Sequence, residues 1–496
     1  MIRSTTGAAL LALWGAGMIA LAYYVYRRQG VTNASEFITA GGRARLGLTT
    51  ASFAVTWMWA GDVLGVPQYV GITGIAGIWM YAAPAVLSSL VVIPFALRMR
   101  RLFPQGLTYS EYFLERFDSR LPHLAVVCVV LYTMVLGGII QLFVGGAVIG
   151  GLTGISPTVV NAVLVAIIGA YILLGGLWSS MTTDFVQFVS AIVLTLVFVP
   201  FLVWQAGDPN VVYQHAVTNL GGQADAFFSM GNLSSLEGLF LPYALGLGVW
   251  GVVSMATWQR VFAVRRDKTS RFLTVGGIGV FTTIAMYGVI GVVGLSAFPE
   301  VSPGNLSVET LSLLPSWAAV VFILVTLMVL GSSVDSYLAA IASLASRDIY
   351  YRHWNRDADS SEQLSVARYA SIVFAVVVFA GTEFVSGRLS FVTLLLIGGI
   401  GASGLVGPFA LSLFWRCTSA GPFVAGVVVS QLVTAYLLLG NAALPGWVGL
   451  KLWEIMAVGH IVSTGLTALG SAVTPDDFAF ADLPDEATRA DGGEER

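Results

Sequence analysis

Stretches of about 20 mostly apolar residues recur along almost the whole chain, and this repetition limits the possible folds more than any other feature. A helix needs about that many apolar residues to cross a bilayer, where no water satisfies an open backbone. The chain is 56% hydrophobic and only 10% charged, whereas soluble proteins carry about 25% charged residues. We therefore predict an all-α polytopic membrane protein embedded in the lipid bilayer. Soluble enzymes and nucleic-acid-binding proteins are excluded.

Division of the chain at polar and Gly/Pro-rich breaks predicts about thirteen transmembrane helices in one membrane domain, residues 1–474. The first is interpreted as a helix and not as a signal peptide, because Arg27 and Arg28 follow its apolar run. The expected helices cover residues 6–26, 47–73, 77–98, 122–152, 158–175, 181–205, 237–262, 271–297, 315–346, 364–384, 389–415, 420–440 and 447–471.

The basic residues predict how these helices cross the membrane, because Lys and Arg are retained in cytoplasmic loops. With the N-terminus outside, all of the 24 basic residues except Arg3, Arg388 and Lys451 fall on the cytoplasmic side. The acidic segment 475–496 then becomes a cytoplasmic tail, which its composition predicts to be disordered. We expect the inner or plasma membrane of a prokaryote.

Two of the predicted helices contain residues that weaken a continuous helix. The second has Gly61, Gly65 and Pro67, and the seventh has several glycines within residues 244–251. Helices interrupted in corresponding halves of a chain indicate the binding site of a transporter, because unwound carbonyl groups coordinate cations. The two helices are five apart, and an inverted repeat requires an odd offset of this kind.

Three carboxylates are predicted to lie at membrane depth: Asp62, Asp184 and Asp335. Ionisable groups are costly there and usually mark the path of an ion or solute. Arg260 lies at the inner end of the seventh helix, and the three carboxylates have no matching number of bases. This imbalance indicates cation handling, although each carboxylate could also be a structural residue satisfied by a neighbour.

Five motifs, taken in order, resemble the sodium:solute symporter family over roughly residues 30–460. The motifs are ASEFITAGG near residue 34, YILLGGLWSSMTTDFVQF at 171–188, ATWQRVFAV near residue 256, LGSSVDSYLAAIASLASRDIY at 330–350 and GGIGASGLVGPFALSLFWRCTSAG at 398–421. The resemblance implies a leucine-transporter-like core of five plus five inverted helices, with one helix before it and two after it. The repeats would cover about 47–205 and 237–415, with the second and seventh helices discontinuous.

The resemblance also implies a sodium site between the break in the second helix and the ninth helix. Its ligands would be the carbonyl oxygens of Val55, Met58 and Val329 and the hydroxyls of Ser332 and Ser333. The two serines follow Val329 by three and four residues, so they share one helix face. The serines could instead bond only to their own helix.

Solute contacts in this family come from the residues just after the break. Here they would be Trp57, Trp59, Gly61 and Asp62, facing Tyr81 and Gln141, with Trp250 or Trp258 as further candidates. The WxWA pattern is similar to the urea-transporting branch, which has no acid at the position of Asp62. A carboxylate repels anions and indole rings attract cations, so we expect a neutral or cationic solute.

A second cation site is implied by the Thr183-Asp184 pair, because some family members bind another sodium ion at this position. Asp184 and Asp335 would form it with Ser332 and Ser336. Two carboxylates in one poorly hydrated site cannot both stay ionised without a cation, so the site would take a sodium ion or a proton. The alternative is that Asp184 pairs with Arg260 and that Asp335 faces another helix.

The functional prediction is a sodium-coupled secondary active symporter that imports a small polar solute by alternating access. Sodium is the expected ligand, and no organic cofactor or obligate protein partner is expected. A non-transporting sensor on the same scaffold and a proton-coupled or urea-type permease are the alternatives. An intramembrane enzyme is disfavoured because the four histidines are scattered and the two cysteines are not spaced as metal ligands.

Overall fold

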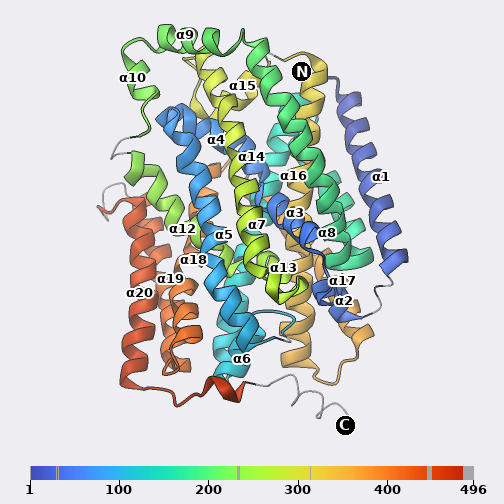
Figure 1. The fold of residues 1–496 in the computed structure, drawn as a ribbon, viewed down its shortest axis with the longest axis vertical. Helices are drawn as coiled ribbons and strands as arrows, with labels where there is room; N and C mark the ends of the chain where they lie inside the picture. The colour runs from blue at the N-terminus through green and yellow to red at the C-terminus, as the bar shows by residue number, and fades with distance from the viewer. Residues whose placement is uncertain are drawn as a thin grey trace.

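The chain folds into a bundle of long helices (Figure 1), as the apolar stretches predict. The computed structural model describes residues 2–29, 31, 33–104, 106–231, 235–312, 314–443 and 449–483. Within them it contains no β-strand, apart from one isolated bridge between Ala44 and Val264. Eleven helices in these ranges are long and apolar enough to span a membrane. They cover Ser4–Arg28, Ala76–Leu102, Arg120–Thr153, Pro157–Gln205, Leu236–Val253, Arg266–Ala297, Ser316–Trp354, Ser360–Val385, Thr393–Phe414, Ala420–Gly440 and Leu452–Val473.

The eleven uninterrupted spans differ from the predicted thirteen for two reasons. The second predicted helix is divided into α3 (Leu46–Trp57) and α4 (Ala60–Thr73), each too short to be counted alone. The fifth and sixth are joined in α8 (Pro157–Gln205), whose 49 residues would reach about 73 Å if straight, more than twice the hydrocarbon thickness. These two observations explain why eleven spans are counted. The number of thirteen membrane crossings stays a prediction.

Helix α8 turns back on itself at Gly176, where φ is 51° and ψ is −132°. Ile167, before the bend, packs against Gly15 of α1 (Ser4–Gln29), and Gln187, after the bend, lies near the neighbouring Trp14. The two legs therefore run side by side in opposite directions. Only glycine fits at the bend, because its φ is positive and a Cβ atom would lie 2.5 Å from the carbonyl oxygen of Phe37.

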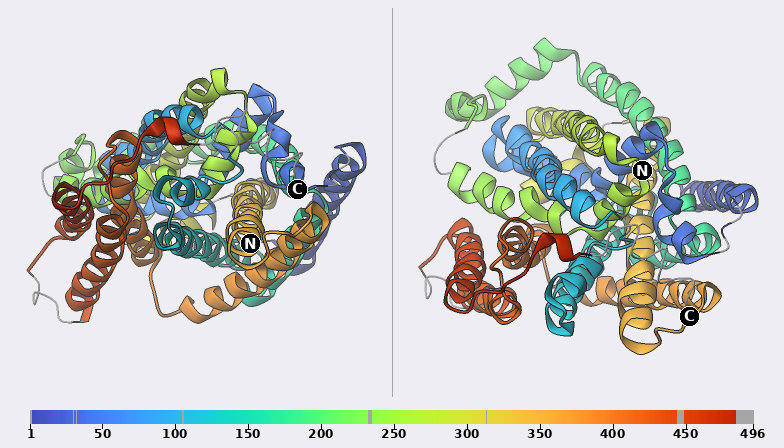
Figure 2. Two further views of the ribbon diagram at one scale, coloured as in Figure 1. Left: turned by 90° about the horizontal axis from the view of Figure 1, so that it is seen from below. Right: turned by 60° about the horizontal axis from the view of Figure 1, so that its bottom comes forward.

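The other helices of the bundle pack around α3, α4 and α8. Helix α1 lies at one edge of the bundle and α19 and α20 at the other (Figures 1 and 2). The long helices are α5 (Ala76–Leu102), α7 (Arg120–Thr153), α12 (Leu241–Val253), α14 (Thr269–Ala297), α16 (Ser316–Ser343), α17 (Ser360–Val385), α18 (Phe391–Phe414), α19 (Ala420–Ala443) and α20 (Leu452–Val473). The short ones are α2 (Ala34–Thr39), α6 (Glu111–Phe117), α9 (Pro209–Leu220), α10 (Ala224–Phe227), α13 (Met255–Ala263) and α15 (Leu306–Ser312).

Both predicted discontinuities are present, but they lie beside the glycines and not at them. Met58 and Trp59 separate α3 from α4, and Ser254 separates α12 from α13. The glycines of the second helix are inside α4, where Gly61 and Gly65 make room for the ring of Phe391 at the start of α18. They serve close helix packing, which small residues allow in membranes.

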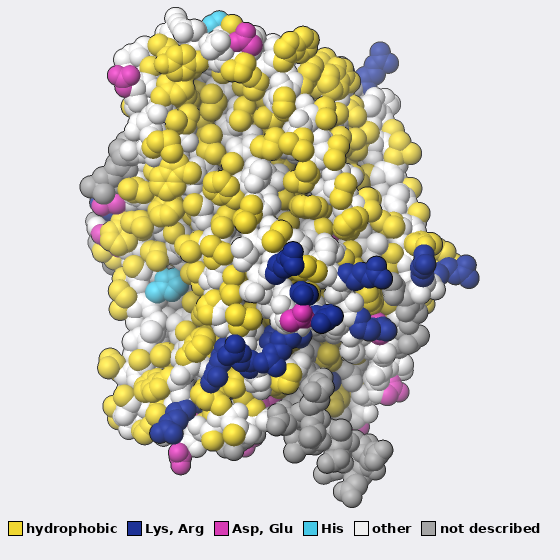
Figure 3. All heavy atoms as spheres, viewed as in Figure 1, with side chains coloured by type: hydrophobic (Ala, Val, Ile, Leu, Met, Phe, Trp, Pro, Cys, Tyr) yellow, Lys and Arg dark blue, Asp and Glu magenta, His cyan; other side chains and the backbone are white. Residues whose placement is uncertain are grey.

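Basic side chains form a band near one end of the molecule (Figure 3). The first part of the acidic tail packs at this end. Buried Arg116 binds the carboxylate of Asp476 at 2.9 Å and lies 3.9 Å from the ring centroid of Phe478, and Leu483 is also buried. Residues 484–496 of the predicted tail lie outside the described residues. Which end faces the cytoplasm stays a prediction.

Candidate functional site

The break between α3 and α4 exposes backbone groups in the middle of the bundle. Met58 and Trp59 are extended, with ψ of 91° and 148°, so the last carbonyl groups of α3 and the first N–H groups of α4 lack helical partners. The Trp59 N–H donates to the Asp62 carboxylate at 2.8 Å, and the Ala60 N–H donates to Oε1 of Gln141 at 2.9 Å. The start of α4 is therefore held by its own third residue and by α7.

Helix α16 lies against the end of α3 and supplies hydroxyl groups there. Oγ of Ser333 lies 3.0 Å from the carbonyl oxygen of Thr56 and 3.1 Å from that of Val329. The Thr56 hydroxyl lies 3.0 Å from that of Ser336. The structure thus brings together both elements of the first predicted sodium site. Its predicted residues Val55, Met58, Val329, Ser332 and Ser333 are all buried.

The chemistry of this site suits sodium, a hard cation that prefers oxygen ligands. The ligand atoms available at this site are neutral carbonyl and hydroxyl oxygens. The hydroxyl of Ser332 is buried beside the Asp184 carboxylate, and its oxygen keeps lone pairs that could bind a cation.

Arg260 of α13 pairs with Asp184 of α8, as the alternative for the second site predicts. Its Nη2 lies 2.8 Å from Oδ2 of Asp184 and 2.6 Å from Oγ of Ser336, and its Nε lies 2.7 Å from Oγ of Ser52. All four side chains are buried. The guanidinium therefore links α3, α8, α13 and α16 in one polar cluster.

Asp335 lies in the same cluster but receives only neutral donors. Its carboxylate accepts hydrogen bonds from Ser180 and Tyr171, both at 2.8 Å, and lies 3.2 Å from the hydroxyl of Thr183. The Ser180 hydroxyl is also 3.4 Å from Asp184, so the two carboxylates are neighbours. Among the described residues, this cluster holds two carboxylates and one guanidinium.

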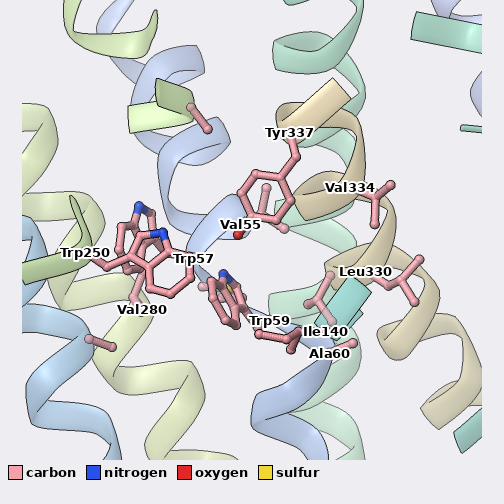
Figure 4. Packing of buried hydrophobic residues seen from close by; sticks show 14 of the residues in the cluster. Val55, Trp57, Trp59, Ala60, Ile140, Trp250, Val280, Leu330, Val334 and Tyr337 are labelled. Atoms are coloured by element: carbon pink, nitrogen blue, oxygen red, sulfur yellow. The ribbon is translucent and has the colours of Figure 1, made fainter. Parts of the chain in front are cut away.

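The structure brings some of the predicted solute residues together and places others apart. The ring centroids of Trp59 and Trp250 are 5.6 Å apart, and Tyr337 of α16 faces Trp59 from 6.5 Å (Figure 4). Trp57 points toward α13, where its Nε1 donates to Thr257 at 3.2 Å. Trp258 lies elsewhere, stacked on Tyr109 at 5.0 Å.

Asp62 is occupied by the chain itself. One oxygen accepts from the Trp59 N–H, and the other accepts from the Tyr81 hydroxyl at 2.9 Å. Gly61 lies under Phe391. In contrast, Nε2 of Gln141 and Nε1 of Trp250 are buried donors without a hydrogen-bond partner among the described residues. Free polar groups near Trp59 are thus donors, not carboxylate oxygens.

Several residues of this region escaped sequence reasoning. Ser52, Ser180 and Tyr171 complete the acidic cluster, and Tyr337 and Phe391 line the aromatic side. Ser180 and Tyr171 belong to the motif at 171–188, so the sequence carried a signal for them. Phe391 carries no signal, because its position depends on how α18 crosses α4.

Long helices with two interrupted members, arranged around buried carbonyl, hydroxyl and carboxylate oxygens, define a multi-pass membrane transporter of the inverted-repeat type. The model of the sodium:solute symporter family matches residues 37–429. The chain belongs to this family, whose members are transporters and not enzymes.

Similar proteins differ in their solutes and coupling ions. The urea-proton symporter DUR3 of Oryza sativa subsp. japonica is 26% identical over 81% of this chain and 60% of its own length. The urea active transporter of Saccharomyces cerevisiae is 24% identical over 86% and 61%, so the chain spans about 60% of the length of these two relatives. The sodium/pantothenate symporter of Haemophilus influenzae is 23% identical over 92% of both chains.

Two solved structures share the fold. An outward-open, substrate-bound Na+-coupled sialic acid symporter superposes with a TM-score of 0.77 at 18% identity, over 95% of this chain and 98% of its own. Mhp1, a nucleobase-cation-symport-1 family transporter, gives 0.60 at 14% identity, over 91% and 98%. These two likenesses confirm the predicted fold class, and the family model confirms the resemblance.

Proposed function

We propose that this chain is a sodium-coupled symporter that imports a small neutral solute by alternating access across a prokaryotic inner or plasma membrane. The observation that carries the proposal is the approach of Ser333 on α16 to the carbonyl groups at the end of α3. A cation bound there would join the interrupted helix to α16, and its departure would release that contact. Sodium release could thereby be linked to a movement of α3 relative to α16.

The acidic cluster supports one further monovalent cation. Asp184 and Asp335 carry two negative charges when ionised, and Arg260 supplies one positive charge. A net charge in a buried site is costly, so one sodium ion or one proton would complete the balance. The Asp184 carboxylate and the Ser332 hydroxyl lie close together and could bind sodium. A proton would reside on Asp335, whose partners are neutral hydroxyls, and this is the feature that favours a proton-coupled alternative.

The solute site supports a small neutral compound with a hydrogen-bond acceptor such as a carbonyl oxygen. Gln141 and Trp250 offer free donors near Trp59, whereas Asp62 is already satisfied. Urea has such a carbonyl group, and several relatives are named as urea transporters. An amine stays within the proposal, because the indole rings could bind it by cation–π attraction.

Uptake by purified protein in liposomes tests this function. Radiolabelled urea should accumulate when a sodium gradient is imposed and should not when potassium replaces sodium. A panel of acetamide, proline, pantothenate and choline as competitors identifies the solute class. Accumulation that requires only a proton gradient would reject sodium as the first coupling ion. Preferred uptake of a carboxylate would reject the donor-lined site as we interpret it.

The ion-to-solute ratio, measured from reversal potentials at two pH values, tests the second cation. A ratio of two sodium ions supports sodium in the acidic cluster. One sodium plus a pH-dependent current, abolished in Asp335→Ser, supports a proton. A ratio of one sodium ion at both pH values, unchanged in Asp335→Ser, would reject a second coupling ion.

A further inference from the structure

A hollow at the basic end of the molecule lies where α5 ends and α14 begins. Its volume is about 660 Å³, and its walls are Leu97 and Arg101 of α5 and the loop residues Arg265, Arg266 and Asp267. The loop joins α13, which carries Arg260, to α14. Neither the solute site nor the acidic cluster includes any of these five residues.

Positive charge in this hollow is not balanced by the chain. Three guanidinium groups face one carboxylate, and Asp267 is already paired with Arg265 at 3.2 Å and with Lys268 at 3.0 Å. Arg101 and Arg266 form no ion pair with a described residue. Several like charges held in a concave site attract an anion strongly, and guanidinium groups match the geometry of phosphate.

Apolar stripes lead away from the basic end along both helices. On α5, Leu87, Leu90 and Leu97 precede Arg101 at spacings that place them on one face, and Leu87 and Leu90 are 38% and 42% exposed. On α14, Val275 and Ile278 follow Arg271 in the same way and are 51% and 59% exposed.

The two stripes lie on neighbouring helices. Gly277 of α14 packs against Ser89 of α5, and both helices are at the front of Figure 1. The same view in Figure 3 shows the basic band below a field of hydrophobic side chains. A phosphate on the arginines would therefore have apolar surface beside it, inside the membrane-spanning part of the helices.

We propose that this hollow and its two stripes bind an anionic phospholipid, with the headgroup phosphate on Arg101, Arg265 and Arg266 and the acyl chains along α5 and α14. The arginines alone would also suit a soluble phosphate. The exposed leucines, valine and isoleucine favour the lipid, because a soluble anion makes no use of them. Basic pockets between transmembrane helices bind phospholipid headgroups by the same combination of charge and depth.

Native mass spectrometry of the purified full chain tests the proposal with three probes: phosphatidylglycerol, phosphatidylcholine and inorganic phosphate. We expect retained phosphatidylglycerol only. The double variant Arg101→Gln/Arg266→Gln should bind it roughly 25-fold more weakly, because each basic residue near an anionic headgroup gives about a fivefold gain. The matched control Arg27→Gln/Arg28→Gln removes equal charge at another helix end and should stay within twofold of the wild type.

The melting temperature without lipid shows whether each variant is folded, and Arg265→Gln replaces the double variant if that one is not. Equal phosphatidylglycerol binding by the pocket variant and the control would overturn the proposal. Binding of phosphatidylcholine as tight as that of phosphatidylglycerol would overturn the role of charge. Binding of inorganic phosphate as tight as that of phosphatidylglycerol would make the hollow a site for soluble anions and would also overturn the proposal.

Discussion

The two interrupted helices are satisfied in different ways. At the break at Ser254, the serine side chain caps α13 by accepting from the Thr257 N–H at 3.5 Å, and the Val253 carbonyl accepts from the Tyr109 hydroxyl at 3.1 Å. The break at Met58 and Trp59 depends on other helices, since Gln141 of α7 binds the start of α4 and Ser333 of α16 reaches the end of α3. A break held from outside can respond when its partners move or when a cation replaces them. We therefore propose that ion coupling acts at the break at Met58 and Trp59, which meets the hydroxyl groups of α16, and that the break at Ser254 is a fixed bend.

The largest effect is expected where the two interrupted helices are tied together. Arg260 of α13 binds Ser52 of α3 as well as Asp184. Arg260→Gln should lower the free energy of unfolding by about 3–5 kcal/mol, because it leaves buried carboxylates unpaired. The melting temperature in detergent measures this loss, and Arg260→Gln/Asp184→Asn should regain part of it. Equal melting temperatures for the single and double variants would contradict the ion pair.

A second experiment contrasts one serine at each break. Ser333→Ala should raise the sodium concentration for half-maximal uptake about tenfold, since a lost hydroxyl ligand costs about 1–3 kcal/mol. Ser332→Ala should act in the same direction. Ser254→Ala should cost about 1 kcal/mol of stability and leave sodium dependence unchanged. Sodium titrations of uptake in liposomes decide the comparison, which fails if Ser254→Ala and Ser333→Ala behave alike.

Variants of Asp62 test whether its carboxylate is structural or binds the solute. Asp62→Ala should lower the efficiency of urea uptake roughly fivefold or more, because the Trp59 N–H and the Tyr81 hydroxyl lose their acceptor. Asp62→Asn keeps an acceptor and should stay within about threefold of the wild type. Initial uptake rates over a range of urea concentrations give both values. Full activity of Asp62→Ala would show that the cap is dispensable.

The smallest effect is expected away from both breaks, at Glu111 of α6. Burial raises the pKa of this carboxyl group, but Arg347 and Arg352 lower it more, to about 2. A depressed pKa stabilises the fold above the ordinary value near 4.5, and the gain is lost as the pH falls toward 2. Between pH 5 and 8, Glu111→Gln should therefore lower the melting temperature by the same few degrees throughout. A pH-dependent difference in that interval would contradict the ion pairs.

The apolar stretches predicted the helices because lipid permits few alternatives to them. They also predicted a boundary between residues 175 and 181, but not that Gly176 alone would turn the chain within one continuous helix, since glycine also occurs inside straight membrane helices such as α14. The breaks were displaced by a few residues for a related reason. Gly61 and Gly65 weaken a helix intrinsically, yet the crossing of α18 turned them into packing positions for Phe391.

The site shows a similar division. Spacing along α16 placed Ser332 and Ser333 on one face, and the structure brings that face to α3. Contacts between side chains of different helices could not be predicted as well. Nothing in the sequence separates Trp250, which meets Trp59, from Trp258, which stacks on Tyr109. The contact of Arg260 with Asp184 was one alternative among two, because helix rotation decides which buried charges meet.

The bend in α8 also concerns how the protein is made. Residues 157–205 leave the ribosome with no loop between the two legs, and only a few polar side chains at 179–184 follow the bend. A straight helix of that length does not fit in the bilayer, so we expect the two legs to enter together as a hairpin bent at Gly176. On this expectation Gly176 acts during membrane insertion, before any ion or solute is bound.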